Sequence, residues 1–127
     1  MQKIADIDIS KYSAVSPNIR SSTLILTDNQ IEHIIKRRGQ AFYDTYSGYF
    51  REIAEDPDYI FPDDKHSNTA VACKTLTVDG KNIHLVIRLA VEADDPEMEN
   101  SIITALYENN KRYAQRLRNN IPLYKKE

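Results

Sequence analysis

Residues 69–91, TAVACKTLTVDGKNIHLVIRLAV, contain the pattern that decides the fold. Every second residue from Ile83 to Val91 is a large aliphatic one, the period of a strand with one face in a core. Asp79-Gly80 favours a two-residue hairpin turn, so we expect residues 69–78 to form the antiparallel partner strand. The register places Thr75 opposite His84, Cys73 opposite Val86 and Val71 opposite Arg88, all on the face away from the aliphatic stripe.

Further elements follow from local patterns on both sides of this hairpin. Thr27 and Gln30 form a capping box before a helix whose apolar stripe is Ile31, Ile34 and Ile35, and Gly39 ends that helix. Strands are expected at residues 23–26, 58–61 and 101–107, the last of them central because both of its faces are apolar. A second helix is expected at residues 43–54.

The order of these elements indicates an α+β protein. We expect N-terminal helices packed on an antiparallel sheet of about four strands, followed by a basic C-terminal helix over residues 110–118. Tyr113, Ala114 and Leu117 would face inward from that last helix. Residues 1–22 are expected to form a partly ordered lead-in, and residues 23–127 a single domain.

Composition places the chain among ordinary cytoplasmic globular proteins. It has 127 residues, 41% hydrophobic and 28% charged, and no run is long enough to span a membrane. Cys73 is the only cysteine, which excludes an internal disulfide and is typical of a small buried residue in a reducing compartment. The N-terminus has no signal-peptide pattern.

The net charge of −2 hides a strong segregation of charge along the chain. Acids gather in residues 52–64 and 92–99, whereas residues 111–126 hold six cations and no acid. Lys36, Arg37 and Arg38 form a second basic cluster. Such asymmetry indicates a polyanionic partner on one side of the molecule, and a merely solvated helix face is the alternative.

Two groups of side chains could carry chemistry. His84 and Arg88, with the strand threonines, would form a phosphate-recognition surface, unless they are solvent-facing strand residues with no task. His33 and Arg37 are neighbours on the first helix, with an ordinary polar helix face as the alternative.

Other chemistries have little support in the sequence. There is no metal-ligand spacing, no glycine-rich phosphate loop and no serine–histidine–aspartate pattern. The eight tyrosines could stack on bases, although core packing already accounts for Tyr46, Tyr49 and Tyr113.

Several short segments, taken in order, resemble the phage-associated Barnase–EndoU–colicin–RelE (BECR) nucleases. Each segment is weak alone, and together they cover residues 23–126. They are Leu26-Thr27-Asp28 through Ile31-Glu32-His33-Ile34, Glu55-Asp56-Pro57-Asp58-Tyr59-Ile60, Asn68-Thr69, Asn100-Ser101-Ile102-Ile103-Thr104, and Arg112-Tyr113 through Arg118-Asn119 to Leu123-Tyr124-Lys125.

The resemblance implies a barnase-like fold and a metal-independent ribonuclease with no cofactor. In such enzymes the 2′-hydroxyl of the RNA attacks the adjacent phosphate with acid–base help. From its position in the matching motif, His33 would be the general base or acid. The hydroxyl groups of Ser101 and Thr104, on the late strand, would lie near the scissile phosphate. Those two side chains point to opposite faces of a regular strand, and to the same face only if it is bulged. The implied phosphate stabilisers are Arg37, Lys74 and Arg88, and the implied RNA-binding residues are Arg38, His84, Arg112, Arg116, Arg118 and Lys125.

One departure from the family pattern leaves the activity open. The first helix of such proteins usually ends in Arg-His, whereas this chain has Arg37-Arg38, with His84 as a candidate substitute. The expected partners are RNA, for which tRNA is one candidate, and an immunity or antitoxin protein, as for a phage-associated toxin. The alternative functions are a catalytically silent nucleic-acid- or protein-binding module and a structural role in a mobile element.

Overall fold

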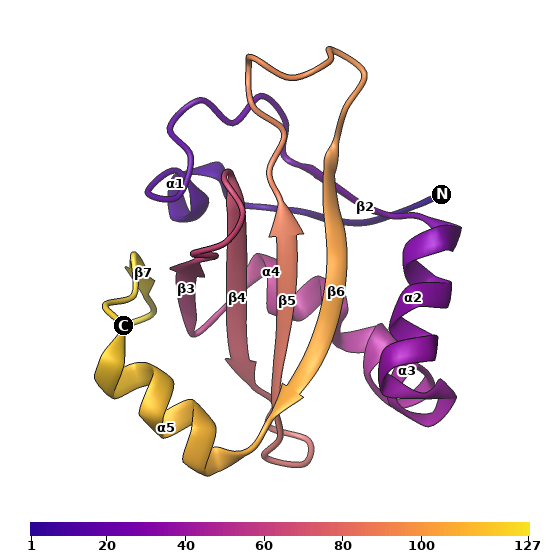
Figure 1. The fold of residues 1–127 in the computed structure, drawn as a ribbon, viewed down its shortest axis with the longest axis vertical. Helices are drawn as coiled ribbons and strands as arrows, with labels where there is room; N and C mark the ends of the chain where they lie inside the picture. Colours follow the sequence, from indigo (N-terminus) through magenta and orange to yellow (C-terminus); the bar gives the residue numbers. More distant parts are fainter.

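The computed structural model describes residues 1–127 and consists of one mixed sheet with helices on both faces (Figure 1). The strands are β1 (Gln2–Asp6), β2 (Thr23–Leu26), β3 (Tyr59–Pro62), β4 (Thr69–Thr75), β5 (Asn82–Arg88), β6 (Asn100–Glu108) and β7 (Tyr124–Lys125). The helices are α1 (Ile9–Tyr12), α2 (Asp28–Arg38), α3 (Gln40–Tyr46), the 3-10 turn η1 (Ser47–Tyr49), α4 (Phe50–Glu55) and α5 (Asn110–Asn119).

The sheet has seven strands in the order β1-β2-β6-β5-β4-β3-β7. β2 and β6 are parallel, and all other neighbours are antiparallel. The prediction of N-terminal helices on an antiparallel sheet of about four strands was therefore wrong, although the chain is α+β. The added strands lie at the edges, where β1 has few apolar residues and β7 only two residues, so neither shows a strand period.

Residues 1–22 belong to this sheet and to its core. β1 pairs with β2, and the amide of Ile7 donates to the carbonyl of Ser22 at 2.8 Å. Tyr12 is fully buried, and its hydroxyl donates to the carbonyl of Ala54 at 2.6 Å. The segment expected as a lead-in thus supplies an edge strand and a core side chain.

The β4–β5 connection is longer than the predicted two-residue turn. Strand pairing ends at Thr75 and Asn82, and the amide of Leu76 donates to the carbonyl of Lys81 at 2.9 Å. Leu76 is 1% exposed, so its burial holds the chain in a wider loop that Gly80 closes with a φ of 71°. Cys73 therefore lies opposite His84, not Val86. The observed register differs from the predicted one by two residues. Because two is an even number, each side chain still points to its predicted face of the sheet.

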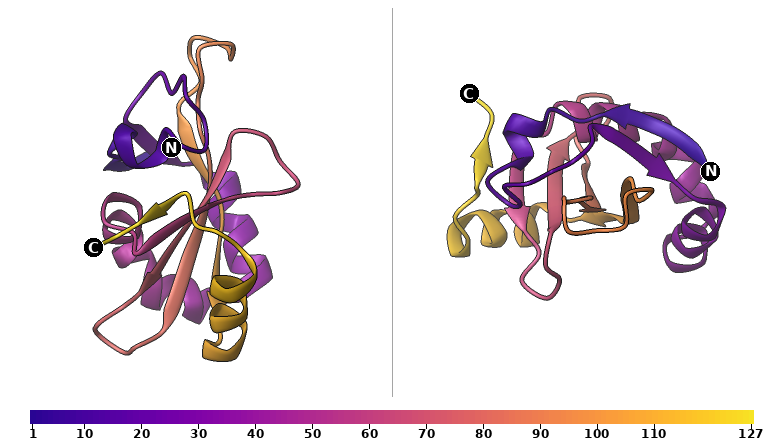
Figure 2. Two further views of the ribbon diagram at one scale, coloured as in Figure 1. Left: turned by 90° about the vertical axis from the view of Figure 1, so that its left-hand side faces the viewer. Right: turned by 90° about the horizontal axis from the view of Figure 1, so that it is seen from above.

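The aliphatic face of the sheet packs against α4. Ile83, Leu85 and Ile87 join Phe50 and Ile53 in the main core, which confirms the alternation seen in the sequence. The opposite face is covered at one end by α5, where Tyr113 packs with Phe61, Val71 and Cys73. Figure 2 shows α4 and α5 on opposite sides of the strands. The inward packing expected for Tyr113 is confirmed, and α5 covers the part of this face that was expected to expose His84.

The central strand β6 contains a bulge. Val86 pairs with Thr104 and Ile87 pairs with Ile102, so Ile103 has no partner on β5. The extra residue puts Ser101 and Thr104 on one face, together with Arg88. β2 pairs with β6 only at Asn100 and Ser101, and beyond this point the free edge of β6 faces α2.

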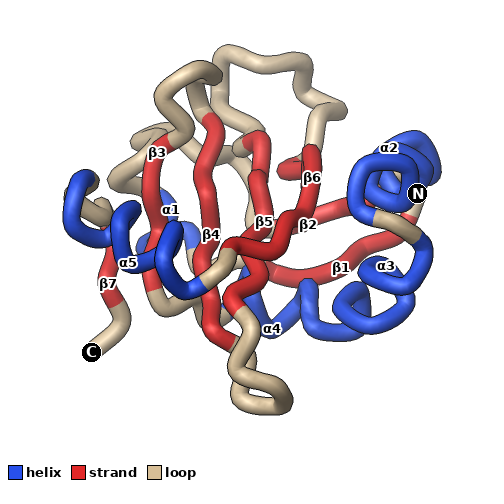
Figure 3. The backbone as a smooth tube through the Cα atoms, turned by 60° about the horizontal axis from the view of Figure 1, so that its bottom comes forward, coloured by secondary structure: helices blue, strands red, loops and turns tan.

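The helices begin and end largely where local signals place them. Thr27 caps α2 by accepting from the amide of Gln30 at 3.3 Å, and Gly39 ends the helix at a φ of 97°. The single helix expected over residues 43–54 was wrong, because η1 separates α3 from α4. Figure 3 shows α2 and α3 at one end of the sheet and α5 at the other. None of these helices has the length and apolarity to cross a membrane.

Candidate nucleic-acid interface

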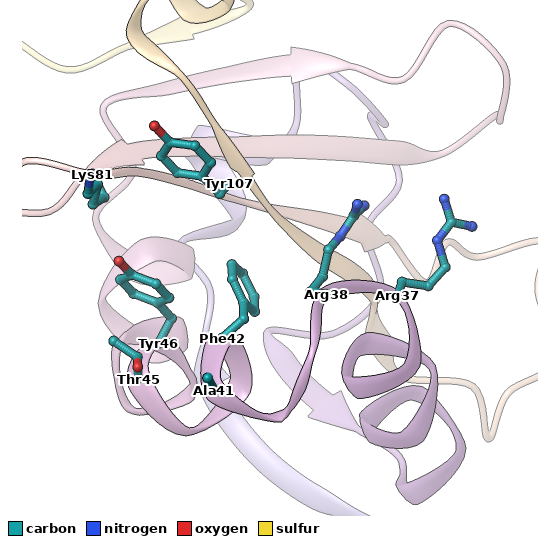
Figure 4. Close-up of a pocket in the computed structure, with 8 residues that line it drawn as sticks. All are labelled: Arg37, Arg38, Ala41, Phe42, Thr45, Tyr46, Lys81 and Tyr107. Carbon is teal, nitrogen blue, oxygen red and sulfur yellow. The ribbon is translucent and has the colours of Figure 1, made fainter.

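The largest groove of the protein, about 640 Å³, lies between the α2–α3 corner and the ends of β5 and β6. We call it the α3 groove (Figure 4). Its lining residues are Arg37, Arg38, Ala41, Phe42, Thr45, Tyr46, Lys81 and Tyr107. Three cations and three aromatic rings therefore meet in one open depression.

The two arginines reach the groove because α2 ends there. Gly39 turns the chain sharply, so α3 starts beside the last turn of α2. Arg38 is anchored, since its Nε donates to the carbonyl of Ala105 on the free edge of β6 at 3.0 Å. Partial burial, together with Arg37 nearby, lowers the pKa of Arg38 from its usual high value. Arg37 takes part in no ion pair, and Figure 4 shows its side chain beyond Arg38, on the side away from the aromatic rings.

The aromatic rings come from α3 and β6. The ring centroids of Phe42 and Tyr46 are 5.2 Å apart, and their planes are tilted by 53°. Tyr107 is 47% exposed on β6, with the Nζ of Lys81 5.7 Å from its ring centroid. This half-exposed ring offers a stacking surface on the part that the Lys81 ammonium does not cover.

Tyr46 ties the α3 groove to the β4–β5 loop. Its hydroxyl donates to Oδ2 of Asp79 at 2.7 Å, and this bond raises the pKa of Tyr46 to about 12. The same contact occupies Asp79, which also accepts from the amide of Lys81 at 3.0 Å. The nearby carboxylate is thus engaged by donors, and Arg37, Arg38 and Lys81 dominate the local charge.

A second groove, about 450 Å³, runs along α5 on the other face of β6. We call it the α5 groove. Its lining residues are Leu106, Glu108, Arg112, Gln115, Arg116, Asn119 and Asn120. Glu108 binds Arg116 through two hydrogen bonds of 3.0 and 2.9 Å. Although burial opposes it, the hydrogen bonds from Arg116 and His84 hold the pKa of Glu108 below its usual value.

His84 lies beneath this groove instead of on the surface. It is fully buried against the ring of Tyr113, with centroids 4.9 Å apart, and Nε2 lies 3.1 Å from Oε1 of Glu108. Burial lowers the pKa of His84, and the carboxylate of Glu108 only partly offsets this. The phosphate-recognition surface expected from His84 and Arg88 is therefore not formed, because α5 covers His84.

The other residues singled out from the sequence are dispersed. His33 is half-buried on α2, one turn from Arg37, and does not line the α3 groove. Lys74 is buried on the core face, where its Nζ donates to the carbonyl of Asp56 at 2.7 Å. Arg88 is engaged by Asp94, with its NH2 nitrogen 2.9 Å from Oδ1.

Four further candidates have distinct positions. Ser101 and Thr104 are half-buried on the open part of the sheet face. Arg118 is exposed on α5 away from the α5 groove, and Lys125 is exposed on β7 at the far edge of the sheet. The structure therefore joins Arg37 with Arg38 and Arg112 with Arg116. It also places Ser101, Thr104 and Arg88 on one sheet face, but it does not bring them together with Lys74, which lies on the other face.

Sequence reasoning missed most of the α3 groove. Phe42, Lys81 and Tyr107 were not identified, and Tyr46 was assigned to core packing. The one available signal was a tyrosine at the end of a strand next to a charged residue, which is too common to be diagnostic.

No cluster of three or more histidine, cysteine, aspartate or glutamate side chains is placed to hold a metal ion. Comparison with known proteins found no matching family model, curated protein or solved structure.

Proposed function

We propose that this protein binds single-stranded RNA through the α3 groove. The observation that carries the proposal is the meeting of Arg37, Arg38 and Lys81 with the rings of Phe42 and Tyr107 in one open groove. Cations bind the phosphate backbone, and exposed rings stack on unpaired bases of any sequence. The choice of RNA over DNA rests on the family resemblance in the sequence.

The distribution of charge supports this reading. The cations of the α3 groove lie at the corner of α2, whereas the acidic 92–99 loop projects beyond the opposite end of β5 and β6 (Figure 1). A polyanion is thus attracted to one end of the molecule and repelled from the other. A net charge of −2 is compatible with binding because the field is local.

The test is fluorescence anisotropy with a labelled ten-nucleotide 2′-O-methyl oligouridine, which no 2′-hydroxyl attack can cleave. With three cations in the groove, the plot of log affinity against log salt should have a slope of about −2, from about 0.7 per phosphate contact on single strands. Arg37→Ala should weaken binding and reduce that slope by about 0.7. Lys36→Ala is the matched control, because Lys36 is exposed on the same turn but outside the groove.

Tyr107→Ala separates stacking from charge. Loss of one stacked base should cost about 1–3 kcal/mol of binding with no change in the salt slope. Because Tyr107 is 47% exposed, the variant should fold normally, as circular dichroism can check. No binding at low salt, or equal losses for Arg37→Ala and Lys36→Ala, would refute the proposal.

Metal-independent cleavage of the bound RNA is a second candidate function. It is favoured by the position of His33, which lies four residues before Arg37 and so on the adjacent turn of α2. Unmodified RNA incubated with the protein and EDTA should then give products with cyclic-phosphate ends, and His33→Ala should abolish them. His66→Ala is the control, since His66 is exposed near Asp63, outside both grooves. Binding without cleavage would leave the first function alone.

A further inference from the structure

The α5 groove is a polar site that the proposed function does not yet use. Four of its side chains, Arg112, Gln115, Arg116 and Asn119, are three or four residues apart and so form one stripe along α5. Only Leu106 among its lining residues is apolar. The groove is therefore built for a polar ligand.

The hydrogen-bond donors of the α5 groove differ in whether another side chain of the protein already binds them. Arg116 is fixed by Glu108, and its guanidinium lies 6.0 Å from the ring centroid of Phe61. The side chains of Arg112, Gln115 and Asn119 make no hydrogen bond or ion pair within the protein. One uncompensated cation thus stands beside two free carboxamides.

The two grooves are separated by a single strand. Tyr107 lines the α3 groove, whereas its neighbours Leu106 and Glu108 line the α5 groove, because successive side chains of a strand point to opposite faces. β2 pairs with β6 only at Asn100 and Ser101, so no strand continues beside Tyr107. A polymer held in the α3 groove can pass around this end of β6 into the α5 groove.

Resting on the proposed RNA binding, we infer that the α5 groove holds another part of the same RNA strand and selects an unpaired adenine. Carboxamides of Asn and Gln form paired hydrogen bonds with adenine, and Arg112 supplies a contact to the neighbouring phosphate. The α3 groove stacks bases without selecting among them. Base preference therefore resides in Gln115 and Asn119.

The experiment compares 2′-O-methyl RNAs of four and twelve nucleotides by anisotropy. The four-nucleotide RNA fills only the α3 groove, and its affinity should fall in Arg37→Ala but not in Arg112→Ala. The twelve-nucleotide RNA spans both grooves, and Arg112→Ala should weaken its binding severalfold. Arg118→Ala is the matched control, because Arg118 is exposed on the same helix outside the α5 groove.

Base selection is tested with a twelve-nucleotide RNA in which adenines alternate with uridines, so that an adenine can reach the α5 groove in either strand direction. Wild type should prefer this RNA to oligouridine by at least about fivefold, and the double variant Gln115→Ala/Asn119→Ala should bind the two RNAs with equal affinity. Equal affinity of wild type for both RNAs, or equal effects of Arg112→Ala and Arg118→Ala, would overturn the inference. If binding of the four-nucleotide RNA does not depend on Arg37, the proposed function itself fails.

Discussion

The buried histidine should make the stability of this protein depend on pH near neutrality. His84 is fully buried beneath Tyr113, and burial lowers the pKa of its imidazole from the ordinary 6.5. Glu108 and Arg116 are the charged groups that face it, and their effects on the pKa are opposite in sign. The folded protein therefore keeps His84 neutral at a pH where the unfolded chain already binds a proton.

The direction and size of the effect follow from proton linkage. Well above pH 6.5 the imidazole is neutral in both states. As the pH falls, the unfolded state gains the proton before the folded state does, so stability is lost. The free energy of unfolding therefore falls as the pH is lowered from 7 to 5, by at most about 2 kcal/mol, the limit for a histidine that binds no proton in the folded state over this range. For 127 residues at about 2.1 cal/mol/K each, this equals a drop of about 7 °C in Tm.

The assay is thermal unfolding by circular dichroism at half-unit steps from pH 7 to pH 5, for wild type and His84→Phe. The variant keeps an aromatic ring against Tyr113 but has no group to titrate, and Glu108 keeps both hydrogen bonds to Arg116. The drop in Tm should be smaller in the variant, by up to about 7 °C. Because His33 and His66 remain in both proteins, they do not contribute to the difference between the two Tm curves. Parallel Tm curves for the two proteins would refute the reasoning.

Two further predictions concern the residues that hold the scaffold. Asn100 is fully buried and binds the amide of Ala90 at 2.8 Å and the carbonyls of Ser21 and Thr23 at 2.6 and 3.0 Å. Asn100→Ala leaves these backbone groups unpaired, so urea unfolding should show a loss of roughly 3 kcal/mol or more, and a loss under about 1 kcal/mol would contradict this role. Thr27→Ala removes the α2 cap and should cost about 1 kcal/mol in the same assay, whereas the exposed loop variant Thr77→Ala should cost almost nothing.

Some elements of the fold could be read directly from local pattern. The alternation from Ile83 to Leu89 predicted the core face of β5, and the apolar residues on both faces of residues 101–107 predicted a central strand. Thr27 and Gly39 marked the ends of α2. These signals are reliable because each depends on a few neighbouring residues and on the fixed periods of helix and strand.

The candidate site was only partly accessible to the same reasoning. Arg37 and Arg38 stood out as a basic pair, and Arg112 and Arg116 as part of a basic helix. Their partners could not be identified, because Tyr107 comes from a strand distant in sequence. A groove is a relation between elements, and no local period encodes it.

The sequence by itself determined the strand and helix periods, the position of the basic helix, and the face to which each residue of β5 points. Only the tertiary structure decided that β2 runs parallel to β6, that residues 1–22 complete the sheet, and that α5 covers His84. These outcomes depend on which edges and faces remain unfilled after the other elements have packed. The packing of α3 and α5 brings Arg37 and Arg38 from one basic stretch, and Arg112 and Arg116 from the other, into two grooves on either side of β6.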